Sequence, residues 1–344
     1  MTYSPVTSRP RQTAADTSTT ASFGASRRKN ATQVESHEFT ADVIEGLSQT
    51  PKRLHCKHLY DRRGSQLFDQ ICELSEYYPT RTELAIMNRN VDAIADQIGS
   101  NATLVELGSG SSQKTRILLD HLREPAAYLP VDISRGHLLE TATRLRVEHP
   151  GLDIHPLVAD FTQPIQIPPS VRGEKVCVYF PGSTIGNLES QDALKLFRNI
   201  HDLVGPKGGL LIGFDLQKDT DVLHAAYNDS QGITAAFNLN LLHRINREAC
   251  GEFNVSQFEH LAVYDQTHGR IEISIVSTCD QTTHVAGHKF HFIKGERIHT
   301  EYSHKYTIEG FRDMAAATDF TAREVWTDER EWFAVMYLES NDGN

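Results

Sequence analysis

The chain has 344 residues, of which 39% are hydrophobic and 23% are charged, and its formal net charge is −11. This composition is typical of a globular protein, and the acidic balance argues against nucleic acid or an anionic membrane surface as the main partner. No apolar run in the sequence has the length of a transmembrane helix.

The five cysteines are odd in number, scattered, and contain no C-x-x-C pair. This pattern predicts reduced thiols in a cytoplasmic protein and no disulfide framework. The crowded segment His55–His58 contains two histidines and a cysteine, but no second cluster accompanies it. We therefore expect no metal site there.

Residues 1–35 are rich in Thr, Ser, Ala and Arg and contain few large apolar side chains. They bury too little surface to offset the entropy of ordering, so we expect a flexible tail. Structure is expected to begin near Phe39, with Thr40 as the N-cap of a short helix. A second cap, Thr80 or Thr82, is expected to start a longer helix that reaches about Ile98.

The middle of the chain alternates strands and helices, which predicts an α/β fold with a parallel sheet and right-handed crossovers. The expected strands are residues 104–107, 128–133, 152–161, 175–180 and 209–214, and a helix is expected at 190–204.

The pattern changes after Asp215. A helical stretch at 220–242 has a polar break at 227–230, and residues 253–306 are β-rich. A last helix at 308–318 and two strands are expected to complete the main sheet.

The first expected strand runs into the glycine turn Glu106–Gly110. Glycines allow a ligand to approach the backbone, but the third glycine of the dinucleotide fingerprint is replaced near Gln113, which weakens an NAD or FAD interpretation. Glu106 is poorly placed for a pyrophosphate. It suits a cationic or zwitterionic cofactor such as S-adenosylmethionine (SAM).

Acids also end the next two strands. Asp132 is placed to bond ribose hydroxyls, and Asp160 with Phe161 is placed to contact adenine. Each acid alone is equally well explained as a helix N-cap. Together with the glycine turn they favour a SAM site over the alternative of an NAD-dependent oxidoreductase.

Two further positions are candidates for substrate binding. Asn187 follows the fourth strand and is placed to orient a carboxylate or an amine, although Asn is also a common turn residue. Glu301 and Ser303 share one face of an expected strand, where an acceptor and a donor together can bind imidazole. On pattern alone, a solvated strand face explains this pair better.

Five segments together resemble the EgtD-type L-histidine Nα-methyltransferases, the SAM-dependent enzymes of ergothioneine biosynthesis. These segments are Tyr60–Phe68, Glu76–Arg81, Glu106–Gly110, Gly182–Asn187 and Thr300–Lys305. The resemblance runs from about residue 40 to the C-terminus. It implies a Rossmann-like class I SAM methyltransferase sheet with a second, β-rich substrate-binding domain.

With this resemblance the chain divides into three parts. Residues 1–35 are the tail. Residues 82–216 and 306–344 form the SAM-binding methyltransferase domain, and residues 36–81 and 217–305 form the substrate-binding domain.

The resemblance also implies roles for individual residues on the cofactor side. Gly108 and Lys114 would contact the methionine part of SAM, Asp132 the ribose, and Asp160 with Phe161 the adenine.

On the substrate side it implies a histidine pocket, with Tyr60 at the amine as the catalytic residue. The other implied contacts are Tyr77 near the imidazole, Glu301 and Ser303 at its nitrogens, and Asn187 and Tyr227 at the carboxylate. One position departs from the pattern, because Ile273 stands where a methionine is expected.

The implied reaction is methyl transfer from SAM to the α-amine of L-histidine, giving the trimethyl betaine hercynine and S-adenosylhomocysteine without a metal. The expected protein is a cytoplasmic monomer whose partner is a small amino acid. Two alternatives stay open: an N-methyltransferase of a tryptophan derivative, and a non-catalytic protein that binds SAM or an amino acid.

Overall fold

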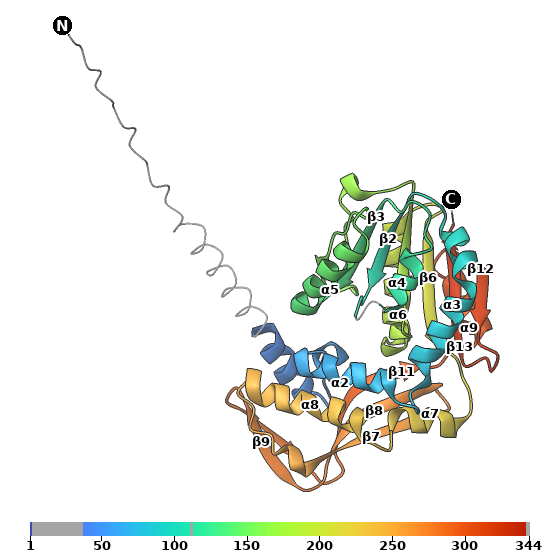
Figure 1. Cartoon of the computed structure of the whole chain (residues 1–344). Coiled ribbons are helices and arrows are strands. Elements are labelled where there is room, and N and C mark those ends of the chain that lie inside the picture. The colour runs from blue at the N-terminus through green and yellow to red at the C-terminus, as the bar shows by residue number, and fades with distance from the viewer. Residues whose placement is uncertain (2–36, 111–112, 342–344) are drawn as a thin grey trace.

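The computed structural model describes residues 1, 37–110 and 113–341. This part of the chain forms two main sheets. In Figure 1 the larger sheet lies above, and one end of its strands faces the β-rich region below it. The flexible tail predicted over residues 1–35 lies, apart from Met1, outside the described residues.

The larger sheet has seven strands in the order β12-β13-β6-β5-β2-β3-β4. The first five along the chain are parallel, and β13 runs antiparallel between β6 and β12. Its strands are β2 (Ala102–Leu107), β3 (Ala127–Asp132), β4 (Leu157–Val158), β5 (Lys175–Phe180), β6 (Gly209–Asp215), β12 (Phe320–Thr327) and β13 (Phe333–Ser340).

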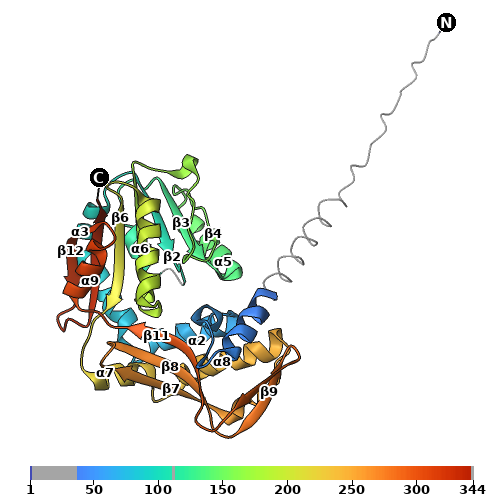
Figure 2. The same cartoon turned by 180° about the vertical axis from the view of Figure 1, so that it is seen from behind.

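Helices cover both faces of this sheet, which explains why β2 and β6 are buried along their whole length. In Figure 1 α3, α4 and α5 lie in front of the sheet, and in Figure 2 α6 and α9 lie in front of the opposite face. These helices are α3 (Tyr78–Ile98), α4 (Gln113–Leu119), α5 (Arg135–Glu148), α6 (Ser190–Val204) and α9 (Ile308–Ala316).

The smaller sheet has the strand order β1-β11-β8-β7, and a separate hairpin pairs β9 with β10. Aliphatic and aromatic side chains of this sheet, of the hairpin and of the helices packed against them form one hydrophobic core. The elements are β1 (Lys52–Arg53), β7 (Phe258–Asp265), β8 (Arg270–Ser277), β9 (Gln281–Val285), β10 (His288–Phe292), β11 (Arg297–His304), α2 (Arg62–Glu73), α7 (Thr220–Tyr227) and α8 (Ile233–Glu248).

Short 3-10 segments complete the described chain: η1 (Cys56–Leu59), η2 (Pro169–Val171), η3 (Thr184–Asn187) and η4 (Val255–Gln257).

Most expected elements are present, including α6 with the predicted bounds and the final helix and two strands that complete the sheet. The third strand is much shorter than expected. Within residues 152–161, only β4 and a single bridge from Ile154 to Tyr128 pair with β3, because Pro156 has no N–H to donate to the ladder. Asp160 therefore lies in a loop.

Two predicted helix starts are wrong. Residues 37–48 are helical, so Thr40 lies inside that helix. Helix α3 begins at Tyr78 with a proline in its first turn, a favoured position for proline, and the Thr82 hydroxyl bonds the Tyr78 carbonyl within the helix. Thr80 and Thr82 are therefore not caps.

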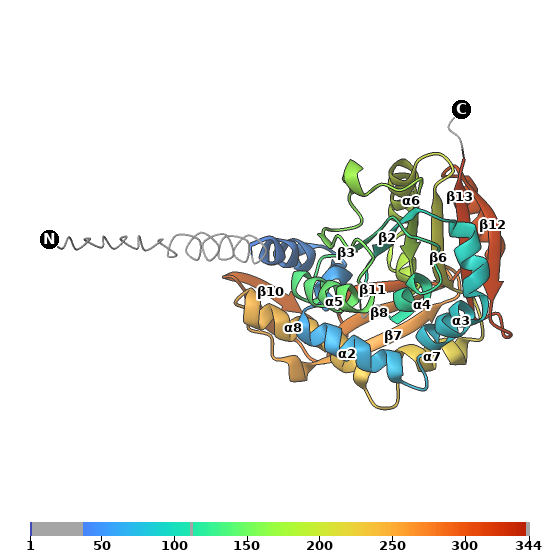
Figure 3. The same cartoon turned by 45° about the horizontal axis from the view of Figure 1, so that its top comes forward.

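The two sheets are joined where the chain crosses between them. Leu216 pairs with Tyr306, and the Tyr306 N–H donates to the Asp215 carbonyl at 2.9 Å. Figure 3 shows β11, β8 and β7 running below the end of the larger sheet. The carboxyl ends of the parallel strands therefore face the smaller sheet. Among the helices of the described residues, none combines the length and apolarity needed to cross a bilayer.

Candidate active site

A cleft of about 1000 Å³ lies between the two sheets, and a smaller cavity of about 60 Å³ continues from it. The two share several lining residues, among them Tyr60, Asn187 and Glu301. All eleven residues expected in the site line one or both: Tyr60, Tyr77, Gly108, Lys114, Asp132, Asp160, Phe161, Asn187, Tyr227, Glu301 and Ser303.

The glycine turn after β2 forms one wall of the cleft. Gly108 and Gly110 have φ angles of 71° and 42°, in the left-handed region that favours glycine. A Cβ atom at Gly108 would meet the Phe161 ring at 3.8 Å, so this ring lies beside the turn. The turn and the Phe161 ring therefore form one continuous part of the cleft wall.

Asp132 and Asp160 are held by local hydrogen bonds. Asp132 Oδ1 accepts from the Ser134 N–H at 2.7 Å, and Asp160 Oδ1 accepts from the N–H and the hydroxyl of Thr162 at 2.9 and 2.6 Å. Burial raises the pKa of Asp132. These bonds restrict both carboxylates to orientations at the edge of the cleft.

Glu106 is buried beneath the turn. The Thr115 hydroxyl donates to both of its carboxylate oxygens, at 2.6 and 2.7 Å, and the Tyr128 hydroxyl also donates to it. Burial raises the pKa of Glu106 to about 7. The carboxyl thus connects the first strand with α4 and β3.

Lys114 is oriented by Glu83, a residue that the sequence did not single out. Glu83 is fully buried on α3, pairs with the Lys114 ammonium, and accepts from the Gly182 N–H at 3.0 Å. A Cβ atom at Gly213 would lie 2.1 Å from Glu83 Oε1, so this glycine makes the space. In the sequence, the signal for Glu83 was an acid among the apolar positions of α3.

Aromatic rings enclose the smaller cavity. Tyr60 packs edge-on against Phe68 and Phe237, with centroid distances of 5.6 and 5.5 Å, and Tyr77 packs against Tyr227 at 6.1 Å. Burial raises the pKa of both Tyr60 and Tyr77 well above the usual value. Both phenols are therefore neutral at physiological pH.

Glu301 has a carboxylate in the cavity with no hydrogen bond or ion pair from the described residues. Burial raises its pKa to about 7, against the opposing charge of Lys305. Ile273 lines the same cavity. The carboxylate is therefore available to a ligand, and an aliphatic wall stands beside it.

Asn187 reaches this region because η3 packs tightly on β11. A Cβ atom at Gly186 would lie 2.9 Å from the His304 carbonyl oxygen, closer than ordinary contact allows. The loop after β5, from the larger sheet, thus lies against the strand that carries Glu301 and Ser303.

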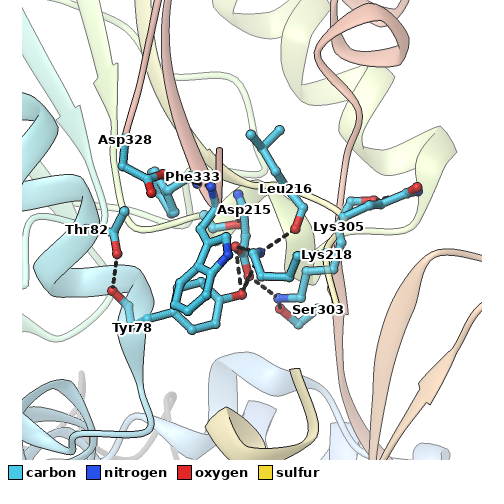
Figure 4. Close-up of polar contacts among 12 residues, drawn as sticks. Tyr78, Thr82, Asp215, Leu216, Lys218, Ser303, Lys305, Asp328 and Phe333 are labelled. Atoms are coloured by element: carbon cyan, nitrogen blue, oxygen red, sulfur yellow. Dashed lines mark hydrogen bonds and ion pairs between the residues drawn. The ribbon is translucent and has the colours of Figure 1, made fainter. Parts of the chain in front are cut away.

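A buried ionic cluster lies beside Ser303 (Figure 4), and its Lys305 ammonium group also donates to the Tyr227 hydroxyl. Asp215, at the carboxyl end of β6, accepts from Tyr78 at 2.7 Å, from Lys218 at 2.6 Å and from Lys305 at 2.7 Å. Burial alone would raise the pKa of Asp215, but the two ammonium groups hold it below its usual range.

Asp215 was not among the residues expected in the site, and Lys305 stood in the last of the five segments without an expected role. An acid at the end of a parallel strand was the signal for Asp215.

The fold and this cleft define the class. Seven strands with one antiparallel member, and a cleft at the strand ends, make this a Rossmann-like SAM-dependent methyltransferase, as the sequence predicted. The family model described as histidine-specific, SAM-dependent methyltransferase matches residues 39–340. The chain belongs to this family, which confirms the resemblance of the five segments.

Close relatives cover nearly the whole described chain. The histidine N-alpha-methyltransferases of Mycolicibacterium smegmatis and Mycobacterium tuberculosis are each 39% identical to it, over 83% and 86% of this chain and 90% and 92% of theirs. Ergothioneine biosynthesis protein 1 of Neurospora crassa is 32% identical over 82% of this chain and 32% of its own length.

Proposed function

We propose that the protein transfers methyl groups from SAM to the α-amine of L-histidine. The observation that carries this proposal is the Glu301 carboxylate, which has no partner among the described residues and lines the same small cavity as Ser303, next to the cofactor cleft. An acceptor and a donor in one small cavity suit an imidazole ring, which has one N–H and one bare nitrogen. Membership of the family supports the same substrate.

The cofactor is proposed to occupy the cleft beside the glycine turn. Gly108 and Lys114 would contact the methionine part of SAM, Asp132 the ribose hydroxyls, and Asp160 with Phe161 the adenine. The close approach of Phe161 to the turn and the fixed carboxylates fit this placement. S-adenosylhomocysteine is the proposed by-product, and the proposed reaction uses no metal.

Histidine is proposed to occupy the smaller cavity. Glu301 accepts from the imidazole N–H, Ser303 donates to the bare nitrogen, and Tyr77 packs near the ring. Asn187 and Tyr227 hold the carboxylate. Tyr60 lies at the amine.

The proposed chemistry is an in-line displacement. The lone pair of the neutral α-amine attacks the sulfonium methyl carbon, a C–N bond forms, and the C–S bond breaks with its electrons remaining on sulfur. After each of the first two transfers, the product ammonium group loses a proton to solvent, which restores the lone pair. Because little acid–base chemistry is required, alignment supplies most of the rate, and the neutral Tyr60 hydroxyl contributes by orienting the amine.

Three rounds of transfer would give the trimethyl betaine hercynine, the first intermediate of ergothioneine biosynthesis. A tertiary amine still has a lone pair, so the second product remains a nucleophile. The mainly aromatic and aliphatic surroundings of Tyr60 suit the added methyl groups.

Mass spectrometry of the purified protein with SAM and histidine tests the proposal. We expect mass gains in steps of one methyl group, ending at the third, with fragmentation placing all of them on the α-nitrogen. Histidine that binds, as measured by calorimetry, but gains no methyl group would instead support a non-catalytic binding protein.

A tryptophan derivative is the alternative substrate. Indole has an N–H but no bare ring nitrogen, so it uses Glu301 and leaves Ser303 without a ring acceptor. The variant Glu301→Ala is expected to weaken histidine binding by roughly 10-fold or more, because an imidazole N–H loses a charged acceptor. Faster methylation of tryptophan than of histidine by the unaltered protein would favour the alternative.

We also propose that the protein acts as a cytoplasmic monomer. All five cysteines are free thiols, which suits a reducing compartment. Light scattering at several concentrations tests the monomer, and a mass that doubles with concentration would contradict it.

A further inference from the structure

The cavity hydroxyls of Tyr227 and Ser303 share one buried ammonium group. Lys305 Nζ lies 2.8 Å from the Tyr227 hydroxyl and 2.8 Å from Ser303 Oγ, and the two hydroxyl oxygens are 2.8 Å from each other. Lys305 is almost completely buried and does not itself line the cavity. Its contact with the substrate site is therefore made through these two hydroxyls.

All three hydrogens of this ammonium group are used. They go to Asp215 Oδ2 at 2.7 Å, to Tyr227 and to Ser303. Burial alone would lower the pKa of Lys305, but the Asp215 carboxylate raises it, so the group stays charged. An ammonium group donates and never accepts, so each hydroxyl oxygen must accept one hydrogen from Lys305.

The directions in which the two hydroxyl hydrogens can point are then restricted. Two hydroxyls carry two hydrogens, and only one of these can lie between the two oxygens. The other is directed elsewhere, and the cavity is the open side. When a ligand offers two acceptors, the bridging hydrogen can also leave, and both hydroxyls then donate to the ligand.

We propose that Lys305, held by Asp215, is a positioning residue that sets Tyr227 and Ser303 as paired hydrogen-bond donors toward the two ends of the substrate. This inference rests on the proposed function. Histidine offers an acceptor at each end, namely its carboxylate and its bare ring nitrogen. One ammonium group therefore couples recognition of the backbone end with recognition of the ring.

Two analogues of histidine test recognition of its ring and of its carboxylate separately. β-(Pyrrol-2-yl)alanine keeps a ring N–H and lacks the bare nitrogen, and histidinol keeps the ring and the amine but lacks the carboxylate. Calorimetry with S-adenosylhomocysteine present gives the loss of affinity for each analogue relative to histidine. We expect the unaltered protein to bind both analogues about 10-fold or more weakly, since the pyrrole leaves a donor unpaired and histidinol offers a neutral hydroxyl in place of a charged acceptor.

Each variant is expected to change this loss of affinity, here called the penalty, for different analogues. Ser303→Ala should reduce only the penalty for the pyrrole analogue, and Tyr227→Phe only the penalty for histidinol. Lys305→Met should reduce both penalties together, with a larger effect on KM than on kcat. The matched control is Lys218→Met, which removes the other ammonium from Asp215 but touches neither hydroxyl, and it should keep both penalties.

Lys305→Arg provides a second test if Lys305→Met does not fold. It keeps the buried charge, but a planar guanidinium does not match three acceptors arranged around one ammonium nitrogen, so both penalties should again fall. A folded Lys305 variant that retains both penalties would overturn the inference. Failure of the unaltered protein to methylate or bind histidine would instead overturn the proposed function.

Discussion

At the scale of single residues, the site combines groups whose ionisation is set by burial. Glu301 lies in the cavity with a pKa of about 7, whereas Tyr60 and Tyr77 are kept as neutral phenols. A buried carboxylate is costly to keep without a partner, and Glu301 has none among the residues that the structure describes. Glu301 is therefore best understood as a group maintained for a ligand.

This cost predicts a pH-dependent stability. The pKa of Glu301 is raised from 4.5 in the unfolded chain to about 7 in the folded one, so folding stability falls as pH rises through this interval. Glu301→Gln should be more stable than the unaltered protein near pH 8 by roughly 1–3 kcal/mol. Near pH 5, where the native carboxyl is protonated, most of the difference should vanish.

Urea unfolding without ligands at both pH values measures it. An equal difference at the two pH values would contradict the assignment.

Tyr60 carries a prediction about catalysis. If its hydroxyl orients the amine, Tyr60→Phe should lower kcat about 10-fold or more and change KM less, because the ring packing against Phe68 and Phe237 is kept. Tyr337→Phe is the control, since the Tyr337 hydroxyl is buried without a partner among the described residues. Steady-state kinetics distinguish the two, and equal kinetics in both variants would remove Tyr60 from the mechanism.

At the scale of elements, β11 and the residue that follows it carry three side chains at or behind the smaller cavity. Glu301, Ser303 and Lys305 are spaced by two, the period at which strand side chains share a face. The first two line the cavity and the third continues into the buried cluster. The loop after β5 completes the site from the other sheet, because η3 packs on this strand.

The packing of η3 on β11 can be tested at one glycine. In Gly186→Ala the added Cβ would lie 2.9 Å from the His304 carbonyl oxygen, which forces η3 away and moves Asn187. Histidine affinity should fall roughly 10-fold while SAM affinity changes little. Gly151→Ala, where the new Cβ meets nothing within 4 Å, is the control. Equal losses for both ligands would show general unfolding instead.

At the scale of the whole molecule, the ionic cluster joins the two halves. Asp215 ends a strand of the larger sheet, Lys305 follows a strand of the smaller one, and Tyr78 begins α3. A buried charge is tolerated only while its partners remain. The same contacts that align the cavity hydroxyls therefore also hold the sheets together.

Asp215→Asn should consequently destabilise the protein by about 3–5 kcal/mol, because two buried ammonium groups lose their counter-charge. Denaturant unfolding measures the change. Glu329→Gln breaks an exposed pair with Arg89 and should change stability little. If both variants unfold at the same denaturant concentration as the unaltered protein, the cluster does not stabilise the junction.

The sequence by itself determined the α/β fold, the glycine turn, Asp132 at the end of β3 and the family, because these depend on local periodicity and on motifs of adjacent residues. It misplaced the start of α3 and the length of the third strand, where Pro79 and Pro156 decide the local geometry.

Only the tertiary structure brought Glu83 to Lys114, and Asp215 to Lys305, because these pairs are separated by 31 and 90 positions in the chain. The local pattern can mark a single buried acid, but its partner is known only once the elements that carry the two residues are packed together.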